Sequence, residues 1–122
     1  KTISILGLSF KPETDDIRES PAKTIIPLLV ENGANVNVYD PVAMENFKKE
    51  FINISYFNSW KDCVLNTHIC VILTEWNEFR GIDLKELKKL LIQPCLVDSR
   101  NIFSIDKLKA ENFLFENIGR NL

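Results

Sequence analysis

The chain has 122 residues, 45% of them hydrophobic and 26% charged, which is typical of one soluble globular domain. A formal net charge of −2 gives no overall basic surface, so we expect no nucleic acid and no acidic membrane among its partners. No apolar run approaches the roughly 20 residues of a membrane span, and no signal peptide is visible.

Strand-like and helix-like patterns alternate along the chain. In chain order they are a strand over Thr2–Leu6, a helix over Ser20–Asn32, a strand over Asn35–Tyr39, a helix over Ala43–Phe51, a strand over Ile54–Phe57, a helical turn or two over Ser59–Leu65, a strand over His68–Leu73, a loop over Thr74–Ile82, a helix over Asp83–Leu91, a strand over Cys95–Val97, a helix over Ile105–Glu111 and a strand over Asn112–Ile118. The nearly all-apolar run at 68–73 predicts a central strand buried on both faces. Pro27, inside the first helix, should remove a backbone bond and kink it.

This alternation predicts an α/β fold, a Rossmann-like, doubly wound, mostly parallel six-stranded sheet in three αβα layers, as a single domain over residues 1–122. The expected strand order is 3-2-1-4-5-6. Ligands of such sheets bind beyond the carboxyl ends of the strands. Here that edge carries the loops 7–19, 40–43, 74–82 and 98–104, which can bring five side chains to one rim: Lys11, Arg18, Glu75, Trp76 and Arg100.

The loop after the first strand has the features of a phosphate site. It runs into a helix predicted to begin with Ser20 as N-cap and Pro21 at the first helical position. Free backbone N–H groups and the helix dipole favour an anion there. Lys11 and Arg18 add two cations that suit phosphate oxygens, and Phe10 could lie against a base, a sugar or the core.

A dinucleotide-binding turn needs G-x-G-x-x-G after its first strand, whereas this loop has only Gly7. A ligand would therefore be held by side chains more than by a glycine cradle. On residue types alone, the alternative stays open that Lys11 and Arg18 only neutralise acidic neighbours on a solvated loop. Asp40, at the end of the second strand, could bind a ribose, but without the glycine turn a turn-capping role beside Pro41 is favoured.

The cysteines Cys63, Cys70 and Cys95 contain no C-x-x-C pair, and the single histidine is His68. These residues offer no metal set, and we expect no metal. The cysteines fit small buried hydrophobes in a reducing cytoplasm, and His68 fits a structural or surface role better than a catalytic one.

Four blocks of sequence, in family order and spacing, resemble the C-terminal nucleotide-sugar-binding domain of the UDP-glucose/GDP-mannose dehydrogenase family. They are GLSFKPETDDIRESPA at 7–22, VYDPVA at 38–43, LTEWNEF at 73–79 and VDSRNI at 97–102. The second and third blocks are most similar to the UDP-glucose 6-dehydrogenase branch. UDP-N-acetylmannosamine dehydrogenases share the first block and remain an alternative, as does the GDP-mannose branch.

The resemblance implies roles at the matching positions. Phe10 and Lys11 match a Phe-Lys pair that contacts the UDP-sugar, and Arg100 matches an arginine that also contacts the nucleotide-sugar. Arg18 matches an arginine that reaches NAD bound by another domain across the cleft. A diphosphate needs cationic donors, and ligand sites often form between domains, so these roles are physically sensible.

The resemblance also implies a parent enzyme that oxidises C6 of UDP-glucose to UDP-glucuronate, in two NAD-dependent steps through a thiohemiacetal on a cysteine, in polysaccharide biosynthesis. The family's G-G-S-C-type block, glycine-rich NAD turn and central helix do not occur here, so this chain should hold no catalytic residue. Because the chain begins at Lys1 and enters a strand at once, we expect a piece excised from a longer polypeptide. The missing family blocks imply roughly the last third of an enzyme, inactive alone, and we expect the parent to be a homo-oligomer.

An alternative of another class is a stand-alone, non-catalytic Rossmann-like binding or regulatory module. A receiver-like phosphoacceptor is one version, suggested by Asp15 and Asp16, but the third predicted strand does not end in an aspartate. An upstream G-x-G-x-x-G and a cysteine block in the parent reading frame would favour the dehydrogenase.

Overall fold

The computed structural model describes residues 1–117, so Ile118, the predicted end of the last strand, lies outside the described residues. Six parallel strands form one sheet in the order β3-β2-β1-β4-β5-β6, as predicted. The strands are β1 (Thr2–Leu6), β2 (Asn35–Tyr39), β3 (Ser55–Tyr56), β4 (Ile69–Ile72), β5 (Cys95–Asp98) and β6 (Leu114–Asn117).

Six helices connect the strands, most of them short. They are α1 (Ala22–Glu31), α2 (Met44–Lys48), α3 (Trp60–Val64), α4 (Asn77–Arg80), α5 (Leu84–Leu90) and α6 (Ile105–Ala110). The one-turn helix α4 lies where a loop was predicted, and α2 is shorter than its predicted range. Within residues 1–117, no helix has the length and apolar character needed to cross a bilayer.

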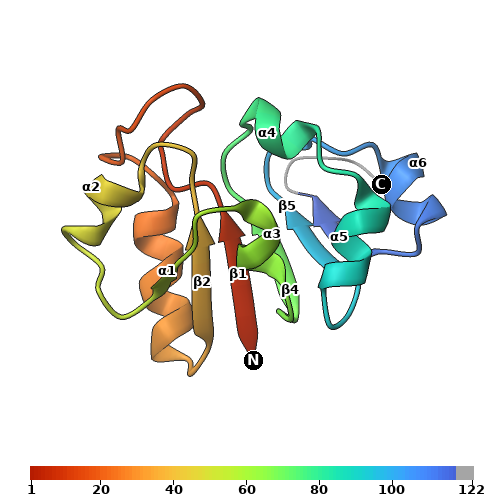
Figure 1. Ribbon diagram of the computed structural model, residues 1–122, viewed down its shortest axis with the longest axis horizontal. Coiled ribbons are helices and arrows are strands. Elements are labelled where there is room, and N and C mark those ends of the chain that lie inside the picture. Colours follow the sequence, from red (N-terminus) through yellow and green to blue (C-terminus); the bar gives the residue numbers. More distant parts are fainter. Residues whose placement is uncertain (118–122) are drawn as a thin grey trace.

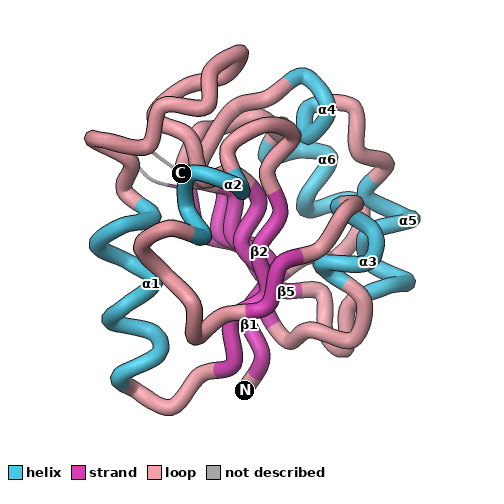
Figure 2. The backbone as a smooth tube through the Cα atoms, turned by 60° about the vertical axis from the view of Figure 1, so that its left-hand side comes forward, coloured by secondary structure: helices cyan, strands magenta, loops and turns pink. Residues whose placement is uncertain are grey.

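The helices cover the sheet in two layers, confirming the three-layer architecture. Figure 2 shows α1 on one side of the sheet and α3, α5 and α6 on the other. In right-handed crossovers, the direction in which the chain moves across the sheet decides the face that the helix covers. The chain moves one way from β1 to β3 and the opposite way from β4 to β6, so the two helix groups lie on opposite faces (Figure 1).

Each face of the sheet has its own core. Ile26 of α1 and Phe47 of α2 pack with Ile5 and Val38 on one face. A second cluster lies on the other face and includes Cys63, Phe79, Leu87 and Leu108 from the helices and Leu6, Cys70, Ile72 and Leu96 from the strands.

The prediction that β4 is buried on both faces is wrong within the described residues. Cys70 and Ile72 are buried, but Ile69 and Val71, on the α1 face, are only partly buried. α1 packs beside β2, and the helices that connect β4, β5 and β6 lie on the other face.

The start of α1 differs from its prediction by one position. Pro21 is the N-cap and its carbonyl accepts the Ile25 N–H at 3.0 Å, so the predicted Ser20 cap is wrong. The Ser20 hydroxyl still accepts the Ala22 N–H at 3.2 Å, in the turn before the helix. Pro27 lies inside α1, as predicted.

Candidate functional site

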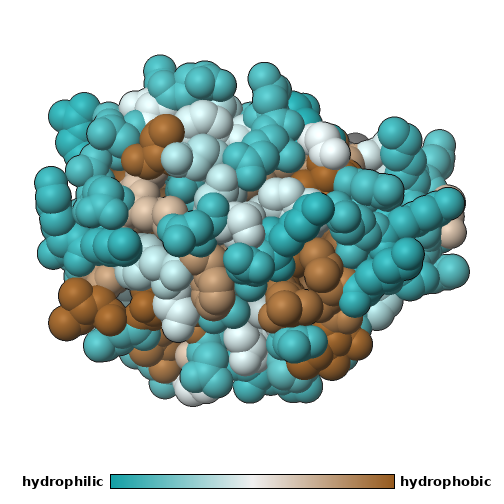
Figure 3. All heavy atoms as spheres, viewed as in Figure 1, coloured by the Kyte–Doolittle hydropathy of each residue, from teal (hydrophilic) through white to brown (hydrophobic). Residues whose placement is uncertain are grey.

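The loops at the carboxyl ends of the parallel strands form one rim of the sheet. In Figure 1 they lie at the top of the view, with the loop between β1 and α1 rising highest. Figure 3 shows mostly hydrophilic residues along that upper edge on the face in view. We call residues 7–21 the first loop.

The first loop is a closed turn held at its base. The Gly7 N–H donates to the Tyr39 carbonyl at 2.9 Å, which continues the pairing of β1 with β2. The Phe10 N–H donates to the Asp16 carbonyl at 2.7 Å and closes residues 10–16 into a tight excursion. Glu13, near its tip, has φ +63°.

Lys11 and Phe10 project from this turn. Lys11 is exposed, and within residues 1–117 its side chain forms no hydrogen bond or ion pair. The Phe10 side chain is 40% exposed and borders a 370 Å³ depression with Asp16, Arg18 and Glu19. An exposed cation beside an aromatic ring can meet a phosphate and a base or sugar.

Arg18 is on the same loop but already has a partner. Its Nε and Nη2 donate to the two carboxylate oxygens of Asp16 at 3.1 and 2.9 Å, and its backbone N–H donates to Asp16 at 3.0 Å. The side chain of Arg18 is 87% exposed. These hydrogen bonds lower the pKa of Asp16 to about 2. Arg18 therefore has the neutralising role left open by the sequence, whereas Lys11 acts on Asp16 only through its charge, without a hydrogen bond or an ion pair among residues 1–117.

Arg100 follows β5 at the same edge. Its Nε donates to the Leu73 carbonyl at 3.1 Å and lies 3.9 Å from a Glu75 carboxylate oxygen. Its backbone N–H donates to Asp98, a buried residue whose carboxylate also accepts the Phe103 N–H at 3.0 Å. Asp98 thus shapes the loop that presents Arg100.

The first loop and the Arg100 loop meet through the segment after β4. The Thr74 hydroxyl donates to the Ser9 carbonyl at 2.9 Å, while Arg100 bonds the adjacent Leu73. Lys11 and Arg100 therefore stand on loops bound to one connecting segment at one edge of the sheet, as expected from the sequence.

Asp40 has the turn-capping role favoured by the sequence. One of its oxygens accepts the N–H groups of Val42 and Ala43 at 2.9 and 2.8 Å. Its second oxygen bonds the first loop and the Trp76 indole, a role that sequence reasoning missed. Trp76 is buried beneath the rim rather than exposed on it. The sequence signal that could have indicated this role is the position of Asp40, a polar residue directly after a buried strand.

A separate groove of 450 Å³ lies on the sheet face beside α1. Aliphatic side chains line most of it, including Ile25, Leu29 and Val71, and it reaches the rim at Pro21, Leu73, Ser99 and Arg100. An aliphatic lining does not suit a diphosphate, so the groove is not the anion site.

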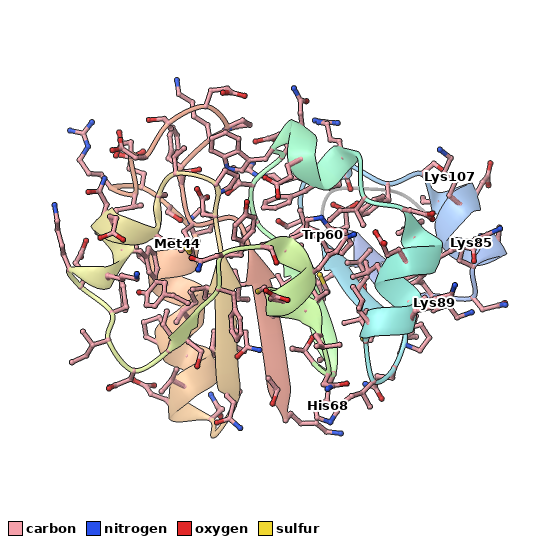
Figure 4. All side chains as sticks on the ribbon, in the orientation of Figure 1. Met44, Trp60, His68, Lys85, Lys89 and Lys107 are labelled. Atoms are coloured by element: carbon pink, nitrogen blue, oxygen red, sulfur yellow. The ribbon has the colours of Figure 1, made fainter. Side chains whose placement is uncertain are left out.

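The cysteines and the histidine lie away from this chemistry. Cys63 and Cys70 are buried, and burial raises the pKa of the Cys70 thiol to about 12. His68 accepts the Thr2 N–H through Nδ1 at 3.1 Å, a structural role at the amino end of the sheet. Figure 4 shows it at the end of the molecule opposite the first loop, with Lys85, Lys89 and Lys107 on α5 and α6, to one side.

The strand order defines a Rossmann-like α/β domain, and its exposed cations stand on loops at the carboxyl edge, where such sheets bind ligands. Residues 4–105 match the sequence profile of the UDP-glucose/GDP-mannose dehydrogenase family, UDP binding domain. The chain belongs to this family, as the resemblance of the four sequence blocks predicted.

Three named proteins show which members of the family this chain is similar to. UDP-glucose 6-dehydrogenase TuaD of Bacillus subtilis is 40% identical over 121 residues, which is 98% of this chain and 26% of that protein. A UDP-glucose dehydrogenase structure from Pyrobaculum islandicum matches with TM-score 0.74 and 31% identity, over 87% of this chain and 23% of that one. A UDP-D-ManNAc dehydrogenase structure from Pyrococcus horikoshii matches with TM-score 0.76 and 28% identity, over 97% of this chain and 25% of that one. The chain thus spans about a quarter of the length of TuaD, rather than the expected third.

Proposed function

We propose that this chain is the UDP-binding domain of an NAD-dependent UDP-glucose 6-dehydrogenase and orients the nucleotide-sugar so that C6 can be oxidised. Family membership and 40% identity to TuaD support this assignment. The observation that supports the proposal most directly is that the loops of Lys11 and Arg100 lie at the same edge of the sheet. Hydrogen bonds to the adjacent residues Leu73 and Thr74 link these two loops. Positioning a substrate lowers the entropic part of the reaction barrier.

In this proposal Lys11 and Arg100 bind the diphosphate or sugar end of the nucleotide-sugar. The Lys11 side chain makes no hydrogen bond or ion pair among the described residues, whereas Arg100 is held by the Leu73 carbonyl and Glu75. Phe10 lies against the base or sugar. The Asp16 pair occupies Nε and Nη2 of Arg18 but leaves Nη1 to donate to NAD bound by another domain.

A titration of the 122-residue chain with UDP tests the site. A charge-assisted hydrogen bond contributes about 1.5–3 kcal/mol, so Lys11→Ala should weaken UDP binding roughly tenfold or more. Lys107→Ala is the matched control, because it removes the same charge from α6, away from the first loop (Figure 4). Equal UDP affinities for Lys11→Ala and the unmodified chain would contradict the proposal.

Arg18→Ala separates the cofactor side from the substrate side in the full-length enzyme. We expect a raised KM for NAD and a nearly unchanged KM for the UDP-sugar. The opposite result would mean that Arg18 and Lys11 have exchanged roles.

A second candidate substrate is UDP-N-acetylmannosamine, which the 28% identity to the Pyrococcus horikoshii enzyme favours. A panel of UDP-glucose, UDP-N-acetylmannosamine and GDP-mannose, assayed with the full-length enzyme and NAD, distinguishes the candidates. A stand-alone binding module is less well supported, because the relatives and structures described above are all dehydrogenases.

We also propose that the enzyme is a cytoplasmic homo-oligomer that supplies a sugar acid for polysaccharide biosynthesis. The three free cysteines fit a reducing compartment. Light scattering on the full-length protein gives the oligomeric state, and a monomer would contradict that part.

A further inference from the structure

Asp40 is a buried carboxylate at the centre of the rim. It is completely buried at the end of β2 and is surrounded by donors rather than by cations. One oxygen accepts the backbone N–H groups of Leu8 and Ser9 at 2.8 and 3.1 Å. The other accepts those of Val42 and Ala43. A single carboxylate therefore fixes the loops that follow two neighbouring strands.

The first of these oxygens, which binds Leu8 and Ser9, also connects to the segment after β4. The Trp76 indole N–H lies 3.3 Å from both Asp40 and the Ser9 hydroxyl. The Ser9 hydroxyl donates to the Lys11 carbonyl at 2.9 Å. A continuous path of short polar contacts thus runs from Asp40 through Ser9 to the backbone of Lys11.

A buried charge without a cation is costly unless several donors satisfy it. No salt bridge of Asp40 exists within residues 1–117, so these hydrogen bonds carry its stabilisation. Those donors belong to loops and not to strands. The free energy gained when they bind the carboxylate therefore depends on the conformations of the loops. The network is thus suited to holding the turn that presents Lys11.

We propose that Asp40 is a positioning residue for the nucleotide-sugar site, acting through Ser9 to hold the Phe10–Lys11 turn ready for the diphosphate. This inference rests on the proposed function. Asp40 does not touch the ligand. It holds the turn in its bound conformation, so that less conformational entropy is lost when UDP binds. Preorganisation of this kind increases affinity.

Asparagine cannot reproduce this arrangement. Both oxygens of Asp40 face donors, and an amide offers one acceptor and one NH₂ donor. In either orientation of the amide, its NH₂ group would face N–H groups, and one of the two loops would lose its anchor. Asp40→Asn therefore changes the network with almost no change in side-chain volume.

The test is a double-mutant cycle on the 122-residue chain, with UDP affinity measured by NMR titration. We expect Asp40→Asn to weaken UDP binding about fivefold or more. Lys11→Ala should cost less affinity in the Asp40→Asn background than in the unmodified chain, because the turn is no longer held. Additive effects of the two substitutions would overturn the inference, since a purely structural aspartate would not act through Lys11.

Thr67→Val is the matched control for stability. Thr67 is also completely buried, and its hydroxyl contacts Ser4 at 3.0 Å, but it precedes β4 at the opposite edge of the sheet. It should lower the unfolding midpoint without changing UDP affinity or its dependence on Lys11. A control that weakens UDP binding as much as Asp40→Asn would mean that global stability explains the result, and this too overturns the inference.

If Asp40→Asn does not fold, Trp76→Phe and Ser9→Ala each remove a smaller part of the same network. Each should weaken UDP binding and reduce the effect of Lys11→Ala, and unchanged behaviour in both contradicts the inference. The proposed function fails separately, if Lys11→Ala in the unmodified background leaves UDP affinity as it was. If Lys11→Ala weakens UDP binding but no network variant does, only the positioning role of Asp40 is contradicted.

Discussion

At the scale of single residues, Asp16 and Arg18 make a prediction about pH. The Arg18 side-chain and backbone hydrogen bonds lower the pKa of Asp16 from 3.8 to about 2. A carboxyl group with a lowered pKa stabilises the folded state above its unfolded pKa, and the stabilisation is lost as the pH falls from about 4 to about 2. Arg18→Ala should move the Asp16 pKa back towards 3.8 but not fully, because the backbone N–H and the charge of Lys11 remain.

The measurement is an NMR titration of the Asp16 carboxyl carbon in both proteins. Lys23→Ala is a suitable control, because Lys23 pairs with Glu50 and not with Asp16. If Arg18→Ala left the Asp16 midpoint near 2, the arginine would not be the cause of the shift.

Gly7 makes a prediction about stability. Its φ is +106°, and a Cβ atom would lie 2.5 Å from the Thr74 hydroxyl oxygen and 2.6 Å from the Thr74 backbone nitrogen. Gly7→Ala should therefore add a steric clash to backbone strain and cost about 3–5 kcal/mol in the free energy of unfolding. Urea denaturation measures this change.

Gly33→Ala is the matched control for strain without a clash. Gly33 also has a positive φ, +86°, but apart from Gly33 and its two chain neighbours no described atom lies within 4 Å of the added Cβ. This substitution should cost only about 1–2 kcal/mol. Equal losses for the two variants would contradict a steric clash between the added Cβ and Thr74.

Residue types explain how far the site could be predicted. Lys11 and Arg100 follow strands that must end at one edge of a parallel sheet, so periodicity was enough to place them there. The Asp16 partner of Arg18 and the donors around Asp40 depend on loop conformation, which no periodic pattern encodes. Sequence could therefore locate the rim but not the network beneath it.

At the scale of elements, α1 carries a proline in its interior. Pro27 has no N–H, so one helical hydrogen bond is missing, and its ring crowds the preceding turn. Pro27→Ala should restore this bond but also give the unfolded chain more conformational freedom. The net effect should be to raise the free energy of unfolding by about 1–2 kcal/mol. Thermal unfolding measures it, and a destabilised variant would show that contacts of the proline ring outweigh the missing bond.

The elements that sequence misjudged are those decided by tertiary contacts. The single turn α4 is too short for a periodic signal, and it is held by Phe79 in the core and by Glu78, which accepts a 2.9 Å hydrogen bond from the Tyr39 hydroxyl. The half-exposed face of β4 reflects where the crossovers put their helices. An apolar run alone does not reveal which face a helix will cover.

At the scale of the whole molecule, topology was predictable because alternating elements and right-handed crossovers leave few arrangements. The parallel sheet also explains why cations more than 80 positions apart, Lys11 and Arg100, share an edge.

The fold also determines how reactive the cysteine thiols of this chain are. Burial raises the pKa of Cys70 to about 12 and that of Cys63 well above 9, so both thiols are protonated at pH 8. A protonated thiol is a poor nucleophile. We therefore expect iodoacetamide at pH 8 to spare both cysteines in the native chain, and the chain to show no turnover of UDP-glucose with NAD.

Unfolding supplies the control for this prediction. In concentrated urea all three cysteines should react, and Cys95, which is only partly buried, should react first when urea is absent. Mass spectrometry of the alkylated peptides identifies the modified positions. Rapid native modification of Cys70 would contradict the raised pKa of its thiol, and turnover by the purified chain would show that its role extends beyond the proposed positioning.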